Sequence, residues 1–541
     1  MDQGEVDLPD DVEALKALVL KGRAEVAAAQ ARLSEDAAFI AHLKLQIAKL
    51  KREQYGSSSE RSSRLIDQLE LQLEEIEADA SEDDLLAEMA AARTTQVAAF
   101  TRKKPARKPF PPHLPRERIV DPTPASCACC GGTRLSKLGE DVTETLEVAP
   151  RSWKVVQHVR EKVSCRDCES ISQAPAPFHV VPRGWAGPSL LAMILFEKYG
   201  QHQPLNRQAE RYALEGVELS LSTLADQVGH CAVALAPLVD RLRAHVMAGT
   251  RLHGDDTPVP VLARGKTDVG RSWVYVRDDR PFGGTAAPAA LFYYSRNRGG
   301  VHVQEHLDGW SGILQADAFG GYNKLYAHDR QPAPVLEAAC WAHSRRKFFV
   351  LADVEAAARR KTEGGKPSPV SPLAVEAVRR IDALFEIERS IKGKSAEERL
   401  VVRKESSAPL VADLHAWMRA HRAGLSRKND VAKAIDYMLT RWDAFSRFLE
   451  DGRICLTNNA AERALRGIAL GRKSWLFAGS DRGGQRAAVM YSLIVTAKLN
   501  AVDPQAWLAD VLARIADHPV SRLDEFLPWN WKLNAGTGPI A

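Results

Sequence analysis

The feature that most constrains the fold is a block of short β-type segments between residues 252 and 317. It contains PVPVL, SWVYVRDD, AALFYYSRN and GILQAD, and glycine pairs at 283–284 and 299–300 mark turns between them. Sequence rich in helix formers lies before this block, over residues 187–248, and after it, from residue 345 to about residue 500. The pattern therefore predicts one sheet with helical regions on both sides.

Acidic residues accompany three of the apolar segments. Asp255 and Asp256 lie in LHGDDTPVPVL, Asp317 ends the strand-like GILQAD, and Glu462 lies in LTNNAAERALR. This order matches an RNase H-like sheet, in which the acids come from a first strand, a later neighbouring strand and a helix. Because carboxylates are the preferred ligands of hard cations, such a trio suits two Mg²⁺ or Mn²⁺ ions and phosphoryl transfer.

Each acid also has a simpler interpretation. Asp255 and Asp317 fit surface carboxylates, and Glu462 fits an i,i+4 ion pair with Arg466 on a helix that Asn458 or Asn459 would cap. These alternatives remain open at the level of the residues alone.

Length and composition bound the class of protein. At 541 residues the chain is long enough for three to five structural units, and no apolar run approaches the roughly 20 residues of a membrane span. The acidic start MDQGEVDLPDD lacks the basic and apolar regions of a signal peptide, so we expect a cytoplasmic protein without membrane contact. The net charge of +5 is mild, but the basic residues of 102–118 suit either a polyanionic partner or a solvated linker.

The N-terminal region is predicted to be helical. Apolar residues recur every seven positions from Val12 to Ile47, which is typical of a coiled coil, although Gly22, Ala29 and Asp36 interrupt the second seam position. A dimerising arm, an antiparallel hairpin and a helix packed on its own protein all fit. Residues 101–122, basic and rich in proline, then predict an extended linker.

Two CxxC pairs predict a metal site. Two such knuckles make one tetrahedral zinc site, and four thiolates leave no open position, so the zinc would be structural. A redox pair and unligated thiols are the alternatives, and Cys129 offers a substitute ligand. Alternating sequence at 141–148 and 152–159 predicts a β-hairpin between the knuckles. The predicted ligands are Cys127, Cys130, Cys165 and Cys168.

Three further cysteines are isolated in sequence. Cys231, Cys340 and Cys455 are interpreted as small buried apolar residues. Residues 205–235 predict two helices in a helix-turn-helix, the second capped by Ser220 or Ser222.

Basic residues surround the second and third acids. Positive side chains follow a strand-like run in CWAHSRRKFF and crowd around Glu462 together with Trp475 and Phe477, which favours a track for DNA phosphates over a merely solvated face. His343 also fits a structural role. Gly479, Gly483 and Gly484 are predicted to let the backbone approach phosphate. The predicted DNA-binding residues are His343, Arg345, Arg346, Lys347, Arg463, Arg466, Arg472, Lys473, Arg482 and Arg486.

Several motifs resemble those of the insertion sequence 66 family of bacterial transposases. The resemblance rests on GDDTPVPVL, ADAFGGY, CWAHSRRKFF and the long block that begins NNAAERALRGIALGRKSWLFAGSDRGGQR. It continues in KLKREQYGSSSER, FPPHLPRERIVDP, the CxxC pairs and LDEFLPWNW, and so spans nearly the whole chain.

The resemblance implies a DDE transposase whose RNase H-like core is interrupted by a helical insertion. Asp255, Asp317 and Glu462 match the three acids and would bind the magnesium ions. Asp256 is the alternative first acid, because adjacent strand residues point to opposite faces and only one of the two reaches the metals. The implied reaction is hydrolysis at the element end followed by attack of the released 3′-OH on target DNA.

This identification carries expectations about partners and alternatives. Double-stranded DNA, both element ends and target, would be the substrate of a homodimer or higher oligomer, with accessory proteins from the same element. The alternatives are a non-catalytic zinc and coiled-coil DNA-binding regulator and an RNase H-like nuclease without joining activity.

The predicted fold class is multidomain α+β. Its divisions are residues 1–100 (helical, coiled coil), 101–122 (linker), 123–182 (zinc module), 183–249 (helical unit, helix-turn-helix-like), 250–345 (first part of the core), 346–455 (helical insertion), 456–502 (second part of the core, with the third acid) and 503–541 (C-terminal helix and tail).

Overall fold

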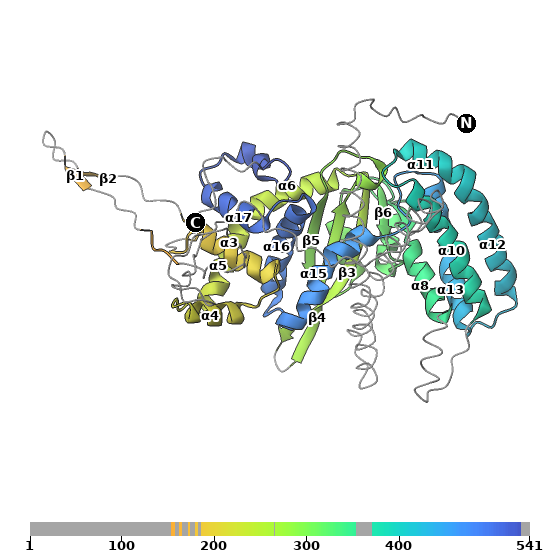
Figure 1. The fold of residues 1–541 in the computed structure, drawn as a ribbon, viewed down its shortest axis with the longest axis horizontal. Coiled ribbons are helices and arrows are strands. Elements are labelled where there is room, and N and C mark those ends of the chain that lie inside the picture. Colours follow the sequence, from red (N-terminus) through yellow and green to blue (C-terminus); the bar gives the residue numbers. More distant parts are fainter. Residues whose placement is uncertain are drawn as a thin grey trace, which may run out of the picture. The chain divides into compact units, whose positions relative to one another are not determined.

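The computed structural model describes residues 153–156, 162–164, 171–173, 179–181, 185–263, 266–352 and 371–531 (Figure 1). The chain divides into two units, residues 79–175 and residues 1–78 with 176–541, and each is described by itself. The predicted coiled coil, the basic linker and the four cysteines of the predicted zinc module lie outside the described residues. They therefore stay predictions.

The smaller unit contains one described hairpin. Strands β1 (Lys162–Ser164) and β2 (Ile171–Gln173) pair antiparallel, with Val163 opposite Ser172. Residues 153–156, part of the hairpin predicted between the knuckles, belong to no strand. Val155, one of these residues, is 90% exposed.

A five-stranded mixed sheet forms the centre of the larger unit, as the β-type segments predict. Its order is β5 (Ala289–Ser295), β4 (Lys266–Arg277), β3 (Arg251–Ala263), β6 (Ile313–Ala316) and β7 (Leu336–Ala339). β3 pairs antiparallel with β4, and β4 with β5, whereas β6 runs parallel to both β3 and β7. Short elements connect the strands: η1 (Arg280–Phe282), α7 (Gly300–His306) and η2 (Gly320–Tyr326).

Among the described residues, four helices precede the sheet: α3 (Pro188–Tyr199), α4 (Leu205–Leu214), α5 (Leu221–Ala234) and α6 (Ala236–Met247). The predicted pair of helices over residues 205–235 is confirmed as α4 and α5. Ser220 caps α5, and its hydroxyl accepts a hydrogen bond from the Thr223 backbone N–H at 3.1 Å.

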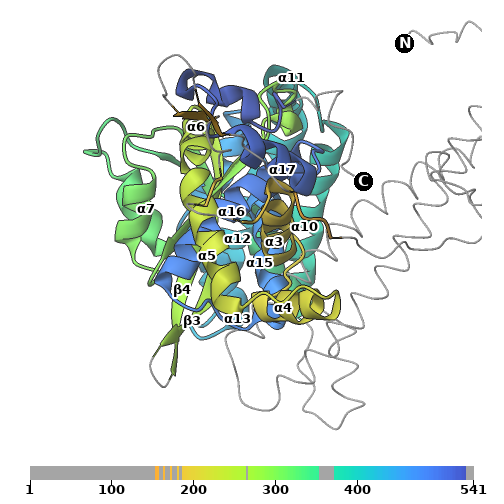
Figure 2. The same cartoon turned by 90° about the vertical axis from the view of Figure 1, so that its left-hand side faces the viewer.

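The chain ends in helices α15 (Asn459–Trp475), α16 (Asp481–Leu499) and α17 (Pro504–Arg514), followed by η5 (Val520–Phe526). Helices α3, α16 and α17 pack against one another (Figure 2). Ser492 and Thr496 of α16 accept hydrogen bonds from the backbone N–H groups of Phe292 and Ala290 in β5. Side chains of α16 thus satisfy an edge strand that would otherwise present free donors.

A helical insertion separates β7 from α15 and lies on the β7 side of the sheet (Figure 1). Its elements are α8 (Trp341–Ala352), α10 (Pro372–Ser390), α11 (Ala396–Val402), η3 (Arg403–Ser407), α12 (Ala408–Ala423), α13 (Asp430–Leu439), α14 (Trp442–Ser446) and η4 (Arg447–Leu449). These helices enclose an apolar core that includes Ile381, Leu414 and Met438. The expected multidomain α+β chain with a helical insertion is thus observed, and none of the described helices is both long and apolar enough to span a lipid bilayer.

Candidate active site

The pairing of β3 with β6 brings the first two acids together. In this parallel pair Arg251 lies opposite Ile313, and His253 lies opposite Gln315, where the pairing ends. Asp255 and Asp317 each come two residues later, so they continue the same register and share the face of His253 and Gln315. The strand order therefore places the two carboxylates side by side, at the point where β3 and β6 separate.

The charges of the other acids act on Asp255. Burial is the largest cause that raises the pKa of the Asp255 carboxyl well above its ordinary value, and the charges of Asp317, Glu462 and Asp256 raise it further. His343 opposes the rise. A carboxyl that feels three other carboxyls at once lies in a site of concentrated negative charge.

Asp256 differs from its neighbour. Its side chain is 1% exposed and is held by two guanidinium groups, Arg271 at 3.2 Å and Arg298 at 2.8 Å. Burial raises the pKa of the Asp256 carboxyl, and the two arginines oppose that rise. Asp256 is therefore paired with two arginines, whereas the charges of the other acids act on Asp255.

The sequence did not predict a role for Arg298, whose guanidinium contacts both Asp256 and Asp317. Besides Asp256, its guanidinium lies 3.4 Å from the Asp317 carboxylate and over the Phe319 ring, 4.0 Å from the centroid. It lies in the loop after β5, far in sequence from both acids. The sequence signal for Arg298 is its position in SRNRGG, a turn that follows a predicted strand.

The third acid is positioned by Asn458, at the N-cap of α15. Asn458 is fully buried, and its amide does not cap the helix, in contrast to the prediction for Asn458 or Asn459. The amide instead donates to the Gly254 carbonyl at 2.9 Å, and its oxygen lies 3.1 Å from Nδ1 of His253. These bonds fasten the start of α15 to β3 next to Asp255, so Glu462, one helical turn later, faces the two aspartates.

His343 lies within the group of acids. It is in the first turn of α8, and its Nδ1 is 3.6 Å from Oε1 of Glu462. Burial lowers the pKa of His343, but the negative charges of Cys340, Glu462 and Asp255 outweigh burial and raise the pKa well above its ordinary value. His343 therefore lies among the acids, a position that its predicted place among DNA-contacting residues did not anticipate.

The other predicted DNA-binding residues fall into two groups. Some already have intramolecular roles: Arg345 pairs with Asp382 at 2.5 Å, Arg472 donates to the Pro258 carbonyl and Arg486 donates to the Ala225 carbonyl. Lys347 lies over the Tyr437 ring, 4.3 Å from its centroid. Lys347, Arg463, Lys473 and Arg482 are exposed, and Arg346 and Arg466 are half-buried.

Packing explains Gly484, one of the three glycines predicted to let the backbone approach phosphate. A Cβ atom on Gly484 would lie 2.5 Å from the Tyr294 ring, so close packing of α16 on β5 requires glycine there.

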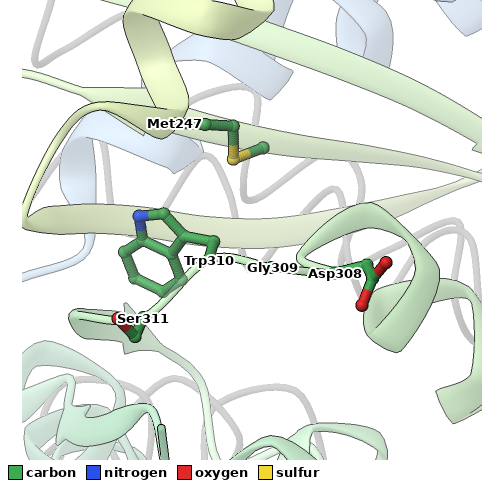
Figure 3. Close-up of a pocket in the computed structure, with 5 residues that line it drawn as sticks. All are labelled: Met247, Asp308, Gly309, Trp310 and Ser311. Atoms are coloured by element: carbon green, nitrogen blue, oxygen red, sulfur yellow. The ribbon is translucent and has the colours of Figure 1, made fainter. Parts of the chain in front are cut away.

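A surface pocket lies away from these acids. It is lined by Met247, Asp308, Gly309, Trp310 and Ser311 (Figure 3). Trp310 donates to the Gly249 carbonyl, before the start of β3, so the pocket belongs to the opposite end of the strands from Asp317. With Asp308 as its ionisable lining residue, it offers no comparable set of ligands.

Comparison with protein families decides the class. The family model described as "Transposase IS66 family" matches residues 183–486, more than half of the chain, and includes every acid discussed above. The chain belongs to the IS66 family of transposases. Further IS66 models match the remaining regions: "Transposase C of IS166 homeodomain" at 42–119, the "zinc-finger binding domain of transposase IS66" at 124–169, and the "IS66 C-terminal element" at 492–529.

Similar full-length proteins occur in Sinorhizobium fredii (strain NBRC 101917 / NGR234). The uncharacterized protein y4hP is 60% identical over 493 residues, covering 91% of this chain and 89% of y4hP. The uncharacterized protein y4qI is 37% identical over 553 residues, covering 98% of each chain. The family models support a transposase function, and the zinc-finger match spans all four predicted zinc ligands.

Proposed function

We propose that this IS66-family protein is a DDE transposase that cleaves DNA at the ends of an insertion sequence and joins the ends to a target duplex. The observation that carries the proposal is the convergence of Asp255, Asp317 and Glu462, seen in the charges that raise the pKa of Asp255. Like charges gathered in a partly buried place are costly unless a cation or a proton compensates them, so such clusters mark functional sites.

The donor set fits divalent metal. Six carboxylate oxygens from two strands and one helix are hard ligands of the kind that Mg²⁺ or Mn²⁺ prefers, and we propose that Asp255, Asp317 and Glu462 hold these ions. Bound divalent cations would supply activation of the attacking oxygen and stabilisation of the leaving one.

The sheet supports an RNase H-like core. Three antiparallel strands, β5, β4 and β3, continue into the parallel strands β6 and β7, and the acids come from β3, from the end of β6 and from α15 beyond the insertion. This is the arrangement that the order of acids in the sequence predicts.

In the proposed reaction, water attacks the phosphorus at the element end, the bond to the 3′-oxygen breaks, and a 3′-OH remains. That hydroxyl then attacks a phosphodiester of the target and displaces another 3′-oxygen. Arg298 holds Asp317 and Asp256 in place, and Asn458 holds α15 against β3. The exposed basic residues Lys473 and Arg482 would bind DNA phosphates. If Lys473→Ala leaves the salt dependence of DNA binding unchanged, Lys473 does not contact a phosphate.

Two further parts of the proposal concern regions outside the described residues. Cys127, Cys130, Cys165 and Cys168 would bind a structural zinc, which metal analysis of the purified protein would test. The heptad pattern in residues 1–100 would mediate dimerisation, since two element ends must be brought together. An unchanged mass in solution after deletion of residues 1–100 would refute that role.

The decisive experiment uses the full-length protein, labelled element-end DNA, a target duplex and Mg²⁺. Asp317→Asn is expected to abolish both cleavage and joining and to leave end binding intact, while exposed Asp308→Asn serves as the matched control and keeps activity. Joining by Asp317→Asn would remove this residue from the mechanism. DNA binding without any cleavage by the unaltered protein would favour a non-catalytic regulator, and cleavage without joining would favour a nuclease.

A further inference from the structure

Cys340 lies at a junction next to the acids. It is the residue between β7 and α8, it is 2% exposed, and its Sγ accepts a hydrogen bond from the Asn458 backbone N–H at 3.3 Å. The sequence suggested a small buried apolar residue, and burial is confirmed, with Ala342 and Phe385 packed beside the sulfur. The same sulfur also receives a backbone donor from Asn458.

His343 follows three residues later, on the same side of the first turn of α8. Its Nδ1 atom is buried and has no hydrogen-bond partner in the described structure, and it lies 3.6 Å from Oε1 of Glu462. The sulfur of Cys340, a ring nitrogen of His343 and a carboxylate oxygen of Glu462 all lie within 4.8 Å of one another. These three atoms come from two helix starts that the whole insertion separates in sequence.

The chemistry of this trio differs from that of the three acids. A thiolate, an imidazole and one carboxylate form the mixed ligand set that zinc and cobalt accept, with bonds of about 2.0–2.3 Å. Mg²⁺ is a hard ion that prefers oxygen and avoids thiolates. Glu462 belongs both to the three acids and to this trio. Mg²⁺ and a thiophilic cation would therefore compete for its carboxylate.

We propose that Cys340, His343 and Glu462 form a second cation site, selective for a thiophilic divalent ion such as Zn²⁺. The three protein ligands leave one tetrahedral position for water or a further group. Asn458 would act as an outer partner that orients the sulfur, as outer partners do in known zinc sites.

A regulatory consequence rests on the proposed function. If Glu462 is the third catalytic acid, an ion held by Cys340 and His343 withdraws it from Asp255 and Asp317. Zn²⁺ would then inhibit Mg²⁺-dependent DNA cleavage. The inhibition would depend on Cys340 and His343, which are not among the proposed Mg²⁺ ligands.

Binding is tested with Co²⁺ on the full-length protein after saturation with zinc and treatment with a chelator, which strips the proposed three-ligand site, whereas the predicted four-cysteine site holds its zinc through four thiolates. The expected result is a thiolate-to-cobalt charge-transfer band in the near ultraviolet. Cys340→Ala is expected to abolish this band and to weaken Co²⁺ binding by at least about 100-fold, since loss of even an outer partner costs about 10–100-fold.

Cys231→Ala is the matched control. Cys231 is also a buried cysteine, in α5, and burial raises the pKa of its thiol to about 12, so it is no ligand. Its alanine variant should keep the band. His343→Gln provides a second variant if Cys340→Ala does not fold, and it should weaken Co²⁺ binding while its far-ultraviolet circular dichroism stays unchanged.

The outcomes separate the two proposals. No band in the unaltered protein, or an equal band in Cys340→Ala, overturns the second cation site whatever the protein does to DNA. A band that depends on Cys340, in a protein that cleaves no DNA, supports the site and counts against the transposase mechanism. Where cleavage occurs, its inhibition by Zn²⁺ is measured relative to each protein's own uninhibited rate. His343→Gln should need at least about tenfold more zinc than the unaltered protein for the same inhibition. Equal sensitivity of the two proteins refutes the regulatory consequence.

Discussion

The helical insertion and the end of the sheet both bury charged side chains, but they do so in opposite ways. In the insertion, Arg403 is fully buried, and its guanidinium donates to both oxygens of Glu388 at 2.6 Å and to the carbonyls of Phe448, Asp451 and Ile454. Arg399 adds a second positive partner for Glu388 at 3.1 Å. Every charge there has an opposite charge beside it.

At the end of the sheet, by contrast, charges of the same sign lie next to one another. Asp255 faces Asp317 and Glu462, and the positive groups near these acids include His343 and Arg298. A protein pairs the buried charges that hold it together, and it gathers like charges where something else, a cation or a substrate, completes the balance. The comparison therefore separates structural carboxylates from functional ones, and it can be broken by mutation.

The largest expected effect distinguishes Asp255 from Asp256. Asp255→Asn should lower the rate of end cleavage by at least about 10³-fold and leave the free energy of unfolding equal or higher, because it removes a charge from a crowd of like charges. Asp256→Asn should instead lower the free energy of unfolding by about 3 kcal/mol, because Arg271 and Arg298 lose their buried partner. Cleavage rates and urea unfolding of the two variants measure this, and the reverse pattern would make Asp256 the first acid.

The next effect concerns stability alone. Glu388→Gln should lower the free energy of unfolding by about 3–5 kcal/mol, since two buried guanidiniums lose the charge that compensates them. Glu386→Gln is the matched control: its carboxylate is 67% exposed and 4.0 Å from Arg389, and such pairs contribute less than about 1 kcal/mol. Equal losses in the two variants would mean that the cluster around Glu388 does not hold the insertion together.

The contrast between these carboxylates also shows what sequence can and cannot predict. The strands, the cap at Ser220 and a helix in the C-terminal segment follow from local patterns, and all are confirmed. The position of Asp317 directly after β6 follows equally from its apolar run and the turn behind it.

Contacts that join distant segments could not be predicted in the same way. β3 is buried on both faces, so no alternation told Asp255 from Asp256, and their difference depends on Arg298 from another loop. The sequence offers Asn458 as a helix cap, but its side-chain amide donates a hydrogen bond to β3, 204 residues earlier. Cys340 and His343 stand three residues apart, a spacing that hints at a shared ligand, yet only the return of the chain through the insertion brings Glu462 to them.

Two partly buried histidines extend the comparison to pH and give the smallest effect. His343 lies among carboxylates, which raise its pKa, whereas His306 stacks on Tyr293 with ring centroids 4.1 Å apart, and burial lowers the pKa of His306 to about 3. Because the folded protein keeps His306 neutral while the unfolded chain binds a proton below about pH 6.5, stability is present above that pH and is lost as the pH falls toward 3.

The loss from His306 between pH 7 and pH 5 should be about 2 kcal/mol. His306→Gln should remove this part of the pH dependence, so the difference in unfolding free energy between the unaltered protein and the variant should shrink by that amount on acidification. Urea titrations at the two pH values measure it, and they cancel the contributions of groups that both proteins share. A difference that stays constant with pH would show that His306 takes up its proton in the folded state, and that burial among aromatic rings does not keep this histidine neutral.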